Sequence, residues 1–372
     1  MTHILRSANL RPIINKVPFY DPHLSYEDNY NKGPFGDFAR PKKLVKEKTL
    51  KYDYLGLKVN LPFGIPAGPL LNSKFIKGAF ENGFDICVYK TVRATAYPCH
   101  PFPNLLAVKK GGSLTLEKLD KPIVVDGLFK DPITITNSFG VPSKNPEVWQ
   151  EDVKKAISYE GKGQVMVLSF MGTVRENQTQ EKFIDDYVLS AKLSYETGAK
   201  VLETNLSCPN IGNEGLVCYN LDVTKKVCEK IRKVIGNTPF SIKVGYYKNT
   251  KDLERLAEIA NEYADDVSGI NTLQAAVVNS DGDQALPGPN RARSGLCGAG
   301  IKWAGLDFVS KLKKIKDKKN YKFSITGVGG VTKPENYFEY REKGADAVMS
   351  ATGAMWNPNL AIEIKSQQNK LA

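Results

Sequence analysis

The arrangement of apolar residues constrains the fold of this 372-residue chain more than any other feature. Eight short apolar segments recur, each rich in β-branched residues and hydrophobic without alternation, as is typical of parallel strands buried on both faces. Helix-length amphipathic stretches separate most of them, so we predict an α/β fold with a closed (β/α)8 TIM barrel rather than an open sheet. The predicted strands cover residues 61–67, 85–90, 164–170, 200–205, 239–244, 267–272, 321–326 and 346–351.

Two of the predicted helices have clear ends. The first covers Thr179–Glu196, places its apolar side chains largely on one face, and is expected to stop at Gly198. The second covers Asp222–Ile235. It is expected to begin with Asp222 as its N-cap and to end at Gly236.

The chain is expected to divide into two parts. Residues 1–55 carry several prolines, many aromatic and charged residues and little periodicity, which predicts an irregular N-terminal extension packed on the body. Residues 56–372 would form the barrel domain. Segments 93–163 and 279–295 interrupt its alternation of strands and helices, and we expect long loops there that build or cover the active site.

Charge and cysteine spacing limit the classes of function. The formal net charge is +12 and the sequence pI is near 9.2, but much of the excess lies in short runs typical of a lysine-rich surface. None of the six cysteines forms a Cys-x-x-Cys pair, so we predict reduced thiols and no metal site. No apolar run approaches 18 residues, and the first residues lack a signal-peptide pattern. We expect a cytoplasmic protein with no membrane span and no nucleic-acid partner.

Polar residues gather where the predicted strands end. Lys90 ends the second strand, Asn205 the fourth, Lys243 the fifth and Asn271 the sixth, and Cys208 follows the fourth closely. Reactive groups of a β/α barrel collect at that end, so these side chains are expected to converge on one opening. Ammonium and amide groups suit an anionic ligand that bears amides. Taken singly, a free cysteine is more often a small buried thiol, and a strand-end lysine more often reaches solvent.

Two further features indicate a bound anion. A lysine within the apolar run 240–244 is costly to bury unless its charge has a partner. Glycines also follow the seventh strand at Gly329-Gly330 and the eighth at Thr352-Gly353. A glycine turn alone is weak support, but two such turns at neighbouring strand ends predict a phosphate site made of backbone N–H groups.

The hexapeptide Asn205-Leu206-Ser207-Cys208-Pro209-Asn210 resembles the active-site loop of the dihydroorotate dehydrogenase family, and the similarity runs from about Leu61 to about Ala354. Position 208 is cysteine where membrane-bound, quinone-using members have serine, so the chain resembles the soluble class 1. The stretch 216–222 is closer to the fumarate-using class 1A than to the NAD-linked class 1B. Further matches are Lys90-Thr91, Asn137-Ser138-Phe139-Gly140-Val141, Lys243, Asn271-Thr272, Gly329-Gly330 and Thr352-Gly353.

This resemblance implies FMN-dependent oxidation of dihydroorotate to orotate in de novo pyrimidine (UMP) biosynthesis. Cys208 would remove the C5 proton while hydride passes from C6 to N5 of FMN, and Lys243 would stabilise negative charge at the N1/O2 edge. The implied substrate-binding residues are Lys90, Asn137, Phe139, Gly140, Val141, Asn205, Asn210, Asn271 and Thr272. The implied FMN-binding residues are Ala67, Gly68, Lys90, Thr91, Asn137, Asn205, Lys243, Ile270, Cys297, Gly298, Gly329, Gly330, Thr352 and Gly353.

Some features depart from the family pattern. Residues 1–55 are not part of the class 1 pattern, Cys297-Gly298 stands where members often have two glycines, and the loop 279–293 is long. The electron acceptor therefore stays open among fumarate, NAD and a quinone, with fumarate favoured. Soluble members are often dimers, which implies a homodimer.

Three other readings stay open at this point. A dihydropyrimidine dehydrogenase-like enzyme would reduce uracil or thymine in the same barrel, and tight binding of orotate but not uracil would argue against it. A tRNA dihydrouridine synthase would share the FMN barrel and a catalytic cysteine. However, its usual RNA-binding helical domain would need more than the about twenty residues after Thr352-Gly353. A flavin-binding barrel without activity is disfavoured by the joint presence of Cys208, Lys90 and Lys243.

Overall fold

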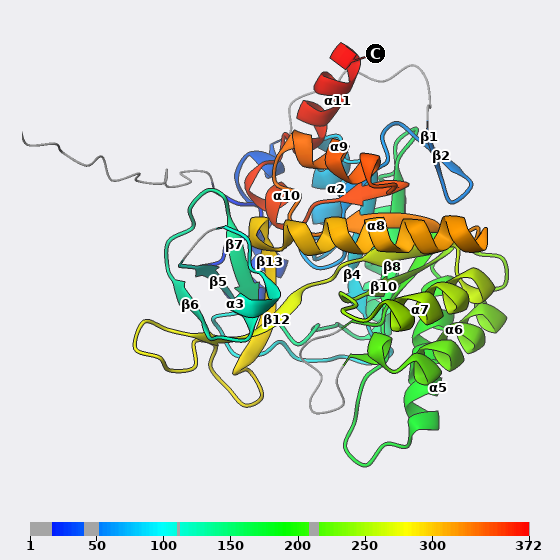
Figure 1. The fold of residues 1–372 in the computed structure, drawn as a ribbon, viewed down its shortest axis with the longest axis horizontal. Coiled ribbons are helices and arrows are strands. Elements are labelled where there is room, and N and C mark those ends of the chain that lie inside the picture. The colour runs from blue at the N-terminus through cyan, green and yellow to red at the C-terminus, as the bar shows by residue number, and fades with distance from the viewer. Residues whose placement is uncertain (1–16, 41–51, 110–111, 208–215, 372) are drawn as a thin grey trace, which may run out of the picture.

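The computed structural model describes residues 17–40, 52–109, 112–207 and 216–371. Eight parallel strands close a barrel, with helices around it (Figure 1). Each predicted strand contains or overlaps one of these eight, so the predicted (β/α)8 barrel is confirmed. In chain order the barrel strands are β3 (Phe63–Ile65), β4 (Ile86–Val92), β8 (Val165–Phe170), β9 (Val201–Asn205), β10 (Phe240–Val244), β11 (Asp266–Gly269), β14 (Ser324–Val328) and β15 (Ala347–Met349).

The barrel strands are buried on both faces, and every residue of β4, β8, β9 and β10 is buried. This explains why their sequences are apolar without alternation. The helices that surround the barrel or follow its last strand are α2 (Ser73–Glu81), α4 (Pro146–Ile157), α5 (Gln180–Tyr195), α6 (Leu221–Ile235), α7 (Thr250–Tyr263), α8 (Lys302–Lys319), α9 (Pro334–Glu342), α10 (Thr352–Trp356) and α11 (Leu360–Leu371). Among the described residues, no helix has the length and apolar character that crossing a bilayer requires.

The ends of the two helices analysed in the sequence are largely as expected. Thr179 caps α5, since its hydroxyl accepts a hydrogen bond from the backbone N–H of Lys182. The predicted cap of α6 is wrong by two positions. Asn220 caps this helix by accepting a hydrogen bond from the backbone of Val223, while Asp222 lies in the first turn and pairs with Arg255.

A second, smaller sheet of five strands, which also closes on itself, stands beside the barrel, where the sequence suggested loops. Three of its strands bury only alternate residues, so their apolar pattern is weaker than that of the barrel strands. The expectation of long loops is therefore wrong for much of segment 93–163, whereas residues 279–292 form a long loop between β12 and β13, as expected. The strands are β5 (Leu105–Val108), β6 (Ile123–Asp126), β7 (Thr134–Asn137), β12 (Leu273–Val278) and β13 (Arg293–Gly298), with the short helices α3 (Leu116–Leu119), η2 (Val217–Tyr219) and η3 (Ala299–Ile301) elsewhere in the chain.

Residues 17–40 pack on the barrel and are not irregular throughout, because they contain α1 (Tyr26–Lys32) and η1 (Gly36–Ala39). The ring of Phe19 lies 4.2 Å from that of Phe38, and the backbone N–H of Phe19 donates to the carbonyl oxygen of Met355. Tyr20 and Tyr26 are buried. The aromatic residues of the extension thus bury apolar surface against the barrel domain.

A hairpin of β1 (Tyr52–Tyr54) and β2 (Leu57–Val59) covers the N-terminal end of the barrel. Tyr54 and Val59 share an apolar cluster with Ile86, Val165 and Val201, which lie at the starts of their strands. The hairpin closes the barrel where its strands begin, at the end opposite their C-terminal ends. The domain boundary drawn after residue 55 falls in its turn.

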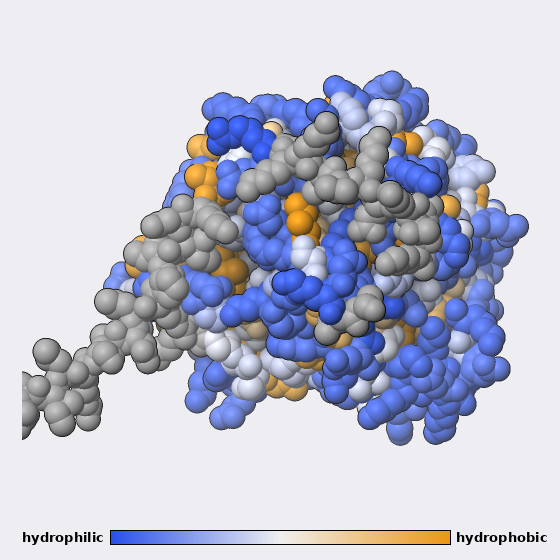
Figure 2. All heavy atoms as spheres, turned by 90° about the horizontal axis from the view of Figure 1, so that it is seen from above, coloured by the Kyte–Doolittle hydropathy of each residue, from blue (hydrophilic) through white to orange (hydrophobic). Residues whose placement is uncertain are grey.

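The face shown in Figure 2 is mainly hydrophilic, with hydrophobic residues in small separate patches. Several surface lysines pair with a carboxylate one helical turn away, as Lys233 does with Glu229 and Lys313 with Asp317. Such exposed pairs contribute little stability individually.

Candidate functional site

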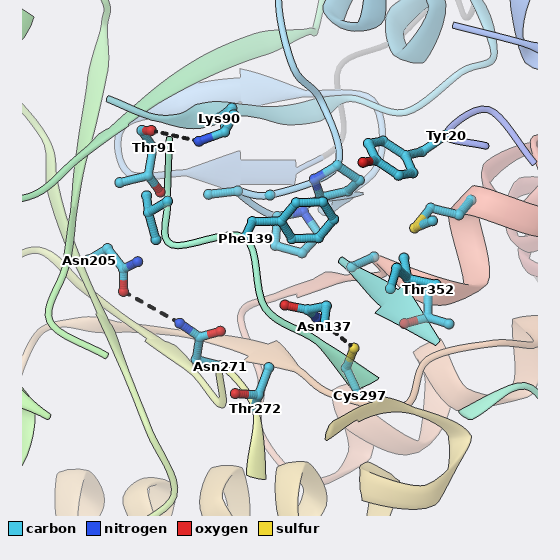
Figure 3. A pocket seen from close by; sticks show the side chains of 18 of the residues that line it. Tyr20, Lys90, Thr91, Asn137, Phe139, Asn205, Asn271, Thr272, Cys297 and Thr352 are labelled. Atoms are coloured by element: carbon cyan, nitrogen blue, oxygen red, sulfur yellow. Dashed lines mark hydrogen bonds between the residues drawn. The ribbon is translucent and has the colours of Figure 1, made fainter. Parts of the chain in front are cut away.

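A cavity opens at the C-terminal ends of the barrel strands, and its empty volume is about 1100 Å³ with the open mouth included. Barrel strands supply one part of its wall and the second sheet another (Figure 3). The structure thus brings most of the predicted site residues together. Those that line the cavity are Ala67, Gly68, Lys90, Thr91, Asn137, Phe139, Val141, Asn205, Lys243, Asn271, Thr272, Cys297 and Thr352.

The remaining predicted residues do not line the cavity or cannot be placed. Cys208 and Asn210 lie outside the described residues. The others are not among the lining residues, although all but Gly330 are next to one in the sequence. They are Gly140, Ile270, Gly298, Gly329, Gly330 and Gly353.

Several lining residues were not predicted. Tyr20 and Tyr26 come from the N-terminal extension, and only the abundance of aromatic residues there could have pointed to them. Ser207 lies within the active-site hexapeptide and could have been included. The other unpredicted lining residues are Pro66, Pro69, Leu71, Leu105, Ile135, Val328, Ala351 and Met355, which carry no chemical signal of their own.

Lys90 stands at the end of β4 with its ammonium group held near the cavity. Its Nζ donates hydrogen bonds to the carbonyl oxygens of Pro142, at 2.6 Å, and Thr91, at 3.2 Å. The ring of Tyr26 lies 5.8 Å from the same nitrogen. Figure 3 shows Lys90 and Tyr20 on the same side of the cavity, facing Asn137 and Asn271 across it. The positive charge is thus fixed at the wall.

Two asparagines and Ser207 form a connected network at the ends of β9 and β11. Asn271 Nδ2 donates to the carbonyl oxygen of Ser207, at 2.5 Å, and more weakly to Asn205 Oδ1, at 3.4 Å. Asn205 Oδ1 also accepts from the backbone N–H of Ser207, at 3.0 Å. These bonds orient both amides and hold the start of the segment that leads to Cys208.

The second sheet contributes Asn137 and Cys297 to the opposite wall. Asn137 Nδ2 donates a hydrogen bond to Cys297 Sγ over 3.3 Å. Burial raises the pKa of the Cys297 thiol to about 11. Cys297 is therefore a neutral thiol at physiological pH rather than a reactive thiolate.

Lys243 lines the floor of the cavity and is almost fully buried. Burial lowers the pKa of its ammonium group, and the charge of Glu203 on the neighbouring strand opposes this. Burial likewise raises the pKa of the Glu203 carboxyl, which Lys243 opposes. A lysine in this position can stabilise negative charge on a ligand, because little water screens it.

A buried arginine fixes the loop after β7. Arg93 donates to the carbonyl oxygens of Gly140, at 3.0 Å, and Val141, at 2.9 Å, and a third bond goes to Gly172. Gly140 has a φ of +75°, and a Cβ there would lie 2.6 Å from the ring of His100. The loop that carries Phe139 and Val141 therefore has one well-defined shape.

The glycines at the ends of β14 and β15 allow close approach of backbone segments. A Cβ at Gly353 would lie 2.3 Å from the carbonyl oxygen of Val331, so the two strand ends touch. Gly330 has a φ of +69°, and a Cβ there would meet the backbone of Lys302 at 2.6 Å. The amides in the first turn of a helix lack intrahelical acceptors, and α10 begins at Thr352.

The residues present fit a flat, anionic group with an attached phosphate, such as FMN. A buried lysine lines the cavity together with amide side chains, and glycine turns follow the neighbouring strands β14 and β15. Thr272 Oγ1 is buried at the cavity and has no hydrogen-bond partner within the described part of the chain, as expected of a group that serves a ligand.

Comparison with known proteins agrees with this geometry. The family model described as dihydroorotate dehydrogenase matches residues 120–371. A dihydroorotate dehydrogenase of Dictyostelium discoideum is 38% identical over 94% of this chain and 97% of its own length.

The names of two further relatives include an electron acceptor. The catalytic subunit of dihydroorotate dehydrogenase B (NAD(+)) of Maridesulfovibrio salexigens is 32% identical over 49% of this chain and 58% of its own length. The dihydroorotate dehydrogenase (fumarate) of Saccharomyces bayanus is 24% identical over 76% of this chain and 86% of its own length. Both relatives are named for acceptors of class 1, in agreement with the predicted class. The family model and the Dictyostelium relative show that the chain belongs to the dihydroorotate dehydrogenase family.

Proposed function

We propose that this protein oxidises dihydroorotate to orotate in pyrimidine biosynthesis, with FMN as its cofactor. The observation that carries the proposal is the convergence of Lys90, Lys243, Asn137, Asn205 and Asn271 on one cavity. A cyclic diamide with a carboxylate offers carbonyl and carboxylate oxygens to these donors, whereas uracil lacks the carboxylate.

The chemistry is divided between the cofactor and the chain. FMN, when bound, accepts the hydride that leaves C6 of dihydroorotate. Lys243 stabilises the negative charge that then develops beside it. Cys208 takes the proton from C5, and a thiol with an ordinary pKa of about 8.5 needs either a site that favours the thiolate or a concerted transfer.

The substrate would lie between the two walls of the cavity. Asn205 and Asn271 from the barrel and Asn137 from the second sheet orient the ring, with Asn210 added from the segment after Cys208. Lys90 faces the carboxylate. Thr272 and the backbone of Phe139, Gly140 and Val141 complete this proposed site.

The cofactor would lie across the ends of the barrel strands. Gly329, Gly330, Thr352 and Gly353 would hold its phosphate. The other proposed cofactor-binding residues would hold its ring, and they are Ala67, Gly68, Lys90, Thr91, Asn137, Asn205, Lys243, Ile270, Cys297 and Gly298.

We further propose fumarate as the acceptor, a homodimer and a cytoplasmic location, on the resemblance to class 1A. Stopped-flow reoxidation of the reduced enzyme with fumarate, NAD and a quinone in parallel tests the acceptor. Faster reoxidation by either of the other two would exclude fumarate. Sedimentation equilibrium tests the dimer, and fluorescence microscopy of the tagged full-length chain tests the location.

The central experiment is anaerobic mixing with dihydroorotate. Purified protein should be yellow, and dihydroorotate should bleach it. Cys208→Ala should keep the colour and lose about 10²- to 10⁴-fold in bleaching rate, the range expected for a general base. Cys228→Ala, which removes a buried thiol from α6, is the matched control and should bleach normally. Colourless protein that takes up no FMN would contradict the whole proposal, and an unchanged rate in Cys208→Ala would contradict the role of that residue.

A further inference from the structure

Glu203 is a buried carboxylate directly below the proposed site, and no role has been given to it so far. It lies in the middle of β9, only 1% of its surface is exposed, and its Oε1 has no hydrogen-bond partner among the described residues. Burying a carboxylate without full pairing costs several kcal/mol. Such a residue calls for a specific reason to be there.

The strand register places Glu203 next to Lys243. In the parallel pair of β9 and β10, Glu203 lies opposite Ser241 and Asn205 lies opposite Lys243. Side chains two positions apart in a strand share a face. Asn205 and Lys243 both line the cavity, so Glu203 faces the barrel interior one layer below them.

The other neighbours of Glu203 do not supply a positive charge. Ser169 of β8 lies opposite it in the register, and Ser268 of β11 stands opposite Lys243. Both hydroxyls lower the pKa of the Glu203 carboxyl, although Ser268 Oγ makes no hydrogen bond among the described residues. The carboxylates of Asp266 of β11 and Glu203 repel each other, since each carries a negative charge. The negative charge of Glu203 also raises the pKa of Tyr54, which belongs to the hairpin below. Among these groups Lys243 is the cation.

We propose that Glu203 is a positioning residue that keeps Lys243 protonated beneath the cofactor ring. The inference rests on the proposed binding of FMN. A buried ammonium group tends to lose its proton, since burial penalises the charged form, and a carboxylate nearby reverses that tendency. Glu203 thereby preserves the positive charge that stabilises an anion above it.

Loss of the Glu203 carboxylate should therefore weaken anion binding in a pH-dependent way. Glu203 raises the pKa of Lys243, so loss of the carboxylate should lower the pH at which Lys243 releases its proton. Above that pH the variant site is neutral where the wild-type site is still positive. A lowering by one pKa unit makes the proton tenfold easier to remove.

Sulfite is a suitable probe, because it adds to bound FMN, makes the ring anionic and removes its visible absorbance. The dissociation constant of sulfite is measured on the FMN-loaded protein from pH 6 to 9 for wild type and Glu203→Gln. The titration of sulfite itself is common to both proteins and cancels in their ratio. We expect the ratio of variant to wild-type constants to be near one or below at pH 6 and to reach at least tenfold at pH 9. A ratio that is constant with pH, or falls as pH rises, would overturn the proposal.

Two further variants separate this role from a structural one. In a Lys243→Met background, Glu203→Gln should no longer change the pH profile, and a persisting pH-dependent loss would also overturn the proposal. Asp186→Asn is the matched control, since it removes a buried carboxylate that pairs with Arg175, and it should leave the pH profile as in the wild type. If Glu203→Gln does not retain FMN, Glu203→Asp replaces it. The shorter aspartate side chain moves the carboxylate away from Lys243, so it should shift the pH profile of sulfite binding in the same direction by a smaller amount. An unchanged profile in Glu203→Asp would contradict the proposed role.

The experiment also distinguishes this inference from the proposed function. Wild-type protein that takes up no FMN would contradict the proposed function. The inference alone would be contradicted if the protein binds FMN and is bleached by dihydroorotate, but Glu203→Gln does not change how the sulfite dissociation constant varies with pH.

Discussion

The ammonium nitrogen of Lys90 lies 5.8 Å from the centre of the Tyr26 ring. Lys90 belongs to the second barrel strand and Tyr26 to the first helix of the N-terminal extension. The extension therefore reaches the charged group that we place next to the substrate. Tyr26 also packs edge-on against Phe139, with the ring centres 6.3 Å apart, which ties the same ring to the loop after β7.

Tyr26→Leu should raise the KM for dihydroorotate by about three- to tenfold, because a cation–π contact contributes about 0.5–2 kcal/mol. Tyr26→Phe keeps the ring and should stay near wild type. Steady-state kinetics checks both. Tyr30→Leu is the control for loss of a neighbouring ring, since Tyr30 packs on Tyr26 but its ring faces the partly exposed Lys144, with the ammonium 5.1 Å from the ring centre. Equal KM values for Tyr26→Leu and wild type would show that the extension does not act on Lys90.

Arg93→Lys should weaken substrate binding without removing FMN. The guanidinium bonds to the carbonyl oxygens of Gly140 and Val141 and to Thr173 Oγ1, and a lysine cannot reproduce this planar set of donors. Each buried acceptor that loses its partner costs about 1–3 kcal/mol. We expect a dissociation constant for orotate at least tenfold higher, measured by calorimetry, with unchanged visible absorbance. The partly exposed Arg175→Lys should change neither, and loss of the yellow colour in Arg93→Lys would mean that the loop serves the cofactor instead.

Asn271→Ala should disconnect the two amides at the site. Asn271 Nδ2 bonds to Ser207 O and Asn205 Oδ1, so its removal frees Asn205 to rotate and loosens the start of the segment that leads to Cys208. Truncation also removes a donor to the substrate. We expect kcat/KM for dihydroorotate to fall by about 10²-fold, in line with the loss of one charge-stabilising or orienting donor. A fall in thermal stability with no change in kcat/KM would show that the network is only structural.

The barrel could be predicted from the sequence because parallel buried strands leave a strong signal. Runs such as Phe240–Val244 are buried on both faces, and Lys243 within that run marked the site. The second sheet was missed because strands such as Leu273–Val278 bury alternate residues only, which leaves a weaker apolar signal. The part played by Tyr20 and Tyr26 was missed for another reason. Their place in the cavity wall depends on how the extension folds back over the barrel, and no local pattern encodes that long-range packing.

Asp266 gives the barrel interior a pH-dependent stability. Burial raises the pKa of its carboxyl from an ordinary value of 3.8 to about 7, although the hydroxyls of Ser241 and Thr326 donate to it at 2.6 and 2.9 Å. Between these two pH values the folded protein holds a proton that the unfolded chain has released. The unfolded state is then favoured as pH rises, so stability should fall from about pH 4 to about pH 7 and level off above.

Asp266→Asn should remove this loss, since a neutral amide of the same shape mimics the protonated carboxyl and still bonds to both hydroxyls. The pKa difference corresponds to on the order of 4 kcal/mol between the two plateaus, to which other titrating groups add. Urea unfolding at pH 5 and pH 8 checks the prediction. The drop in unfolding free energy between the two pH values should be smaller in Asp266→Asn than in wild type, whereas the exposed Asp281→Asn should keep the full drop. Parallel pH profiles for Asp266→Asn and wild type would mean that Asp266 is already ionised in the folded protein at pH 5, and that its charge is stabilised more strongly by the two hydroxyls than burial opposes it.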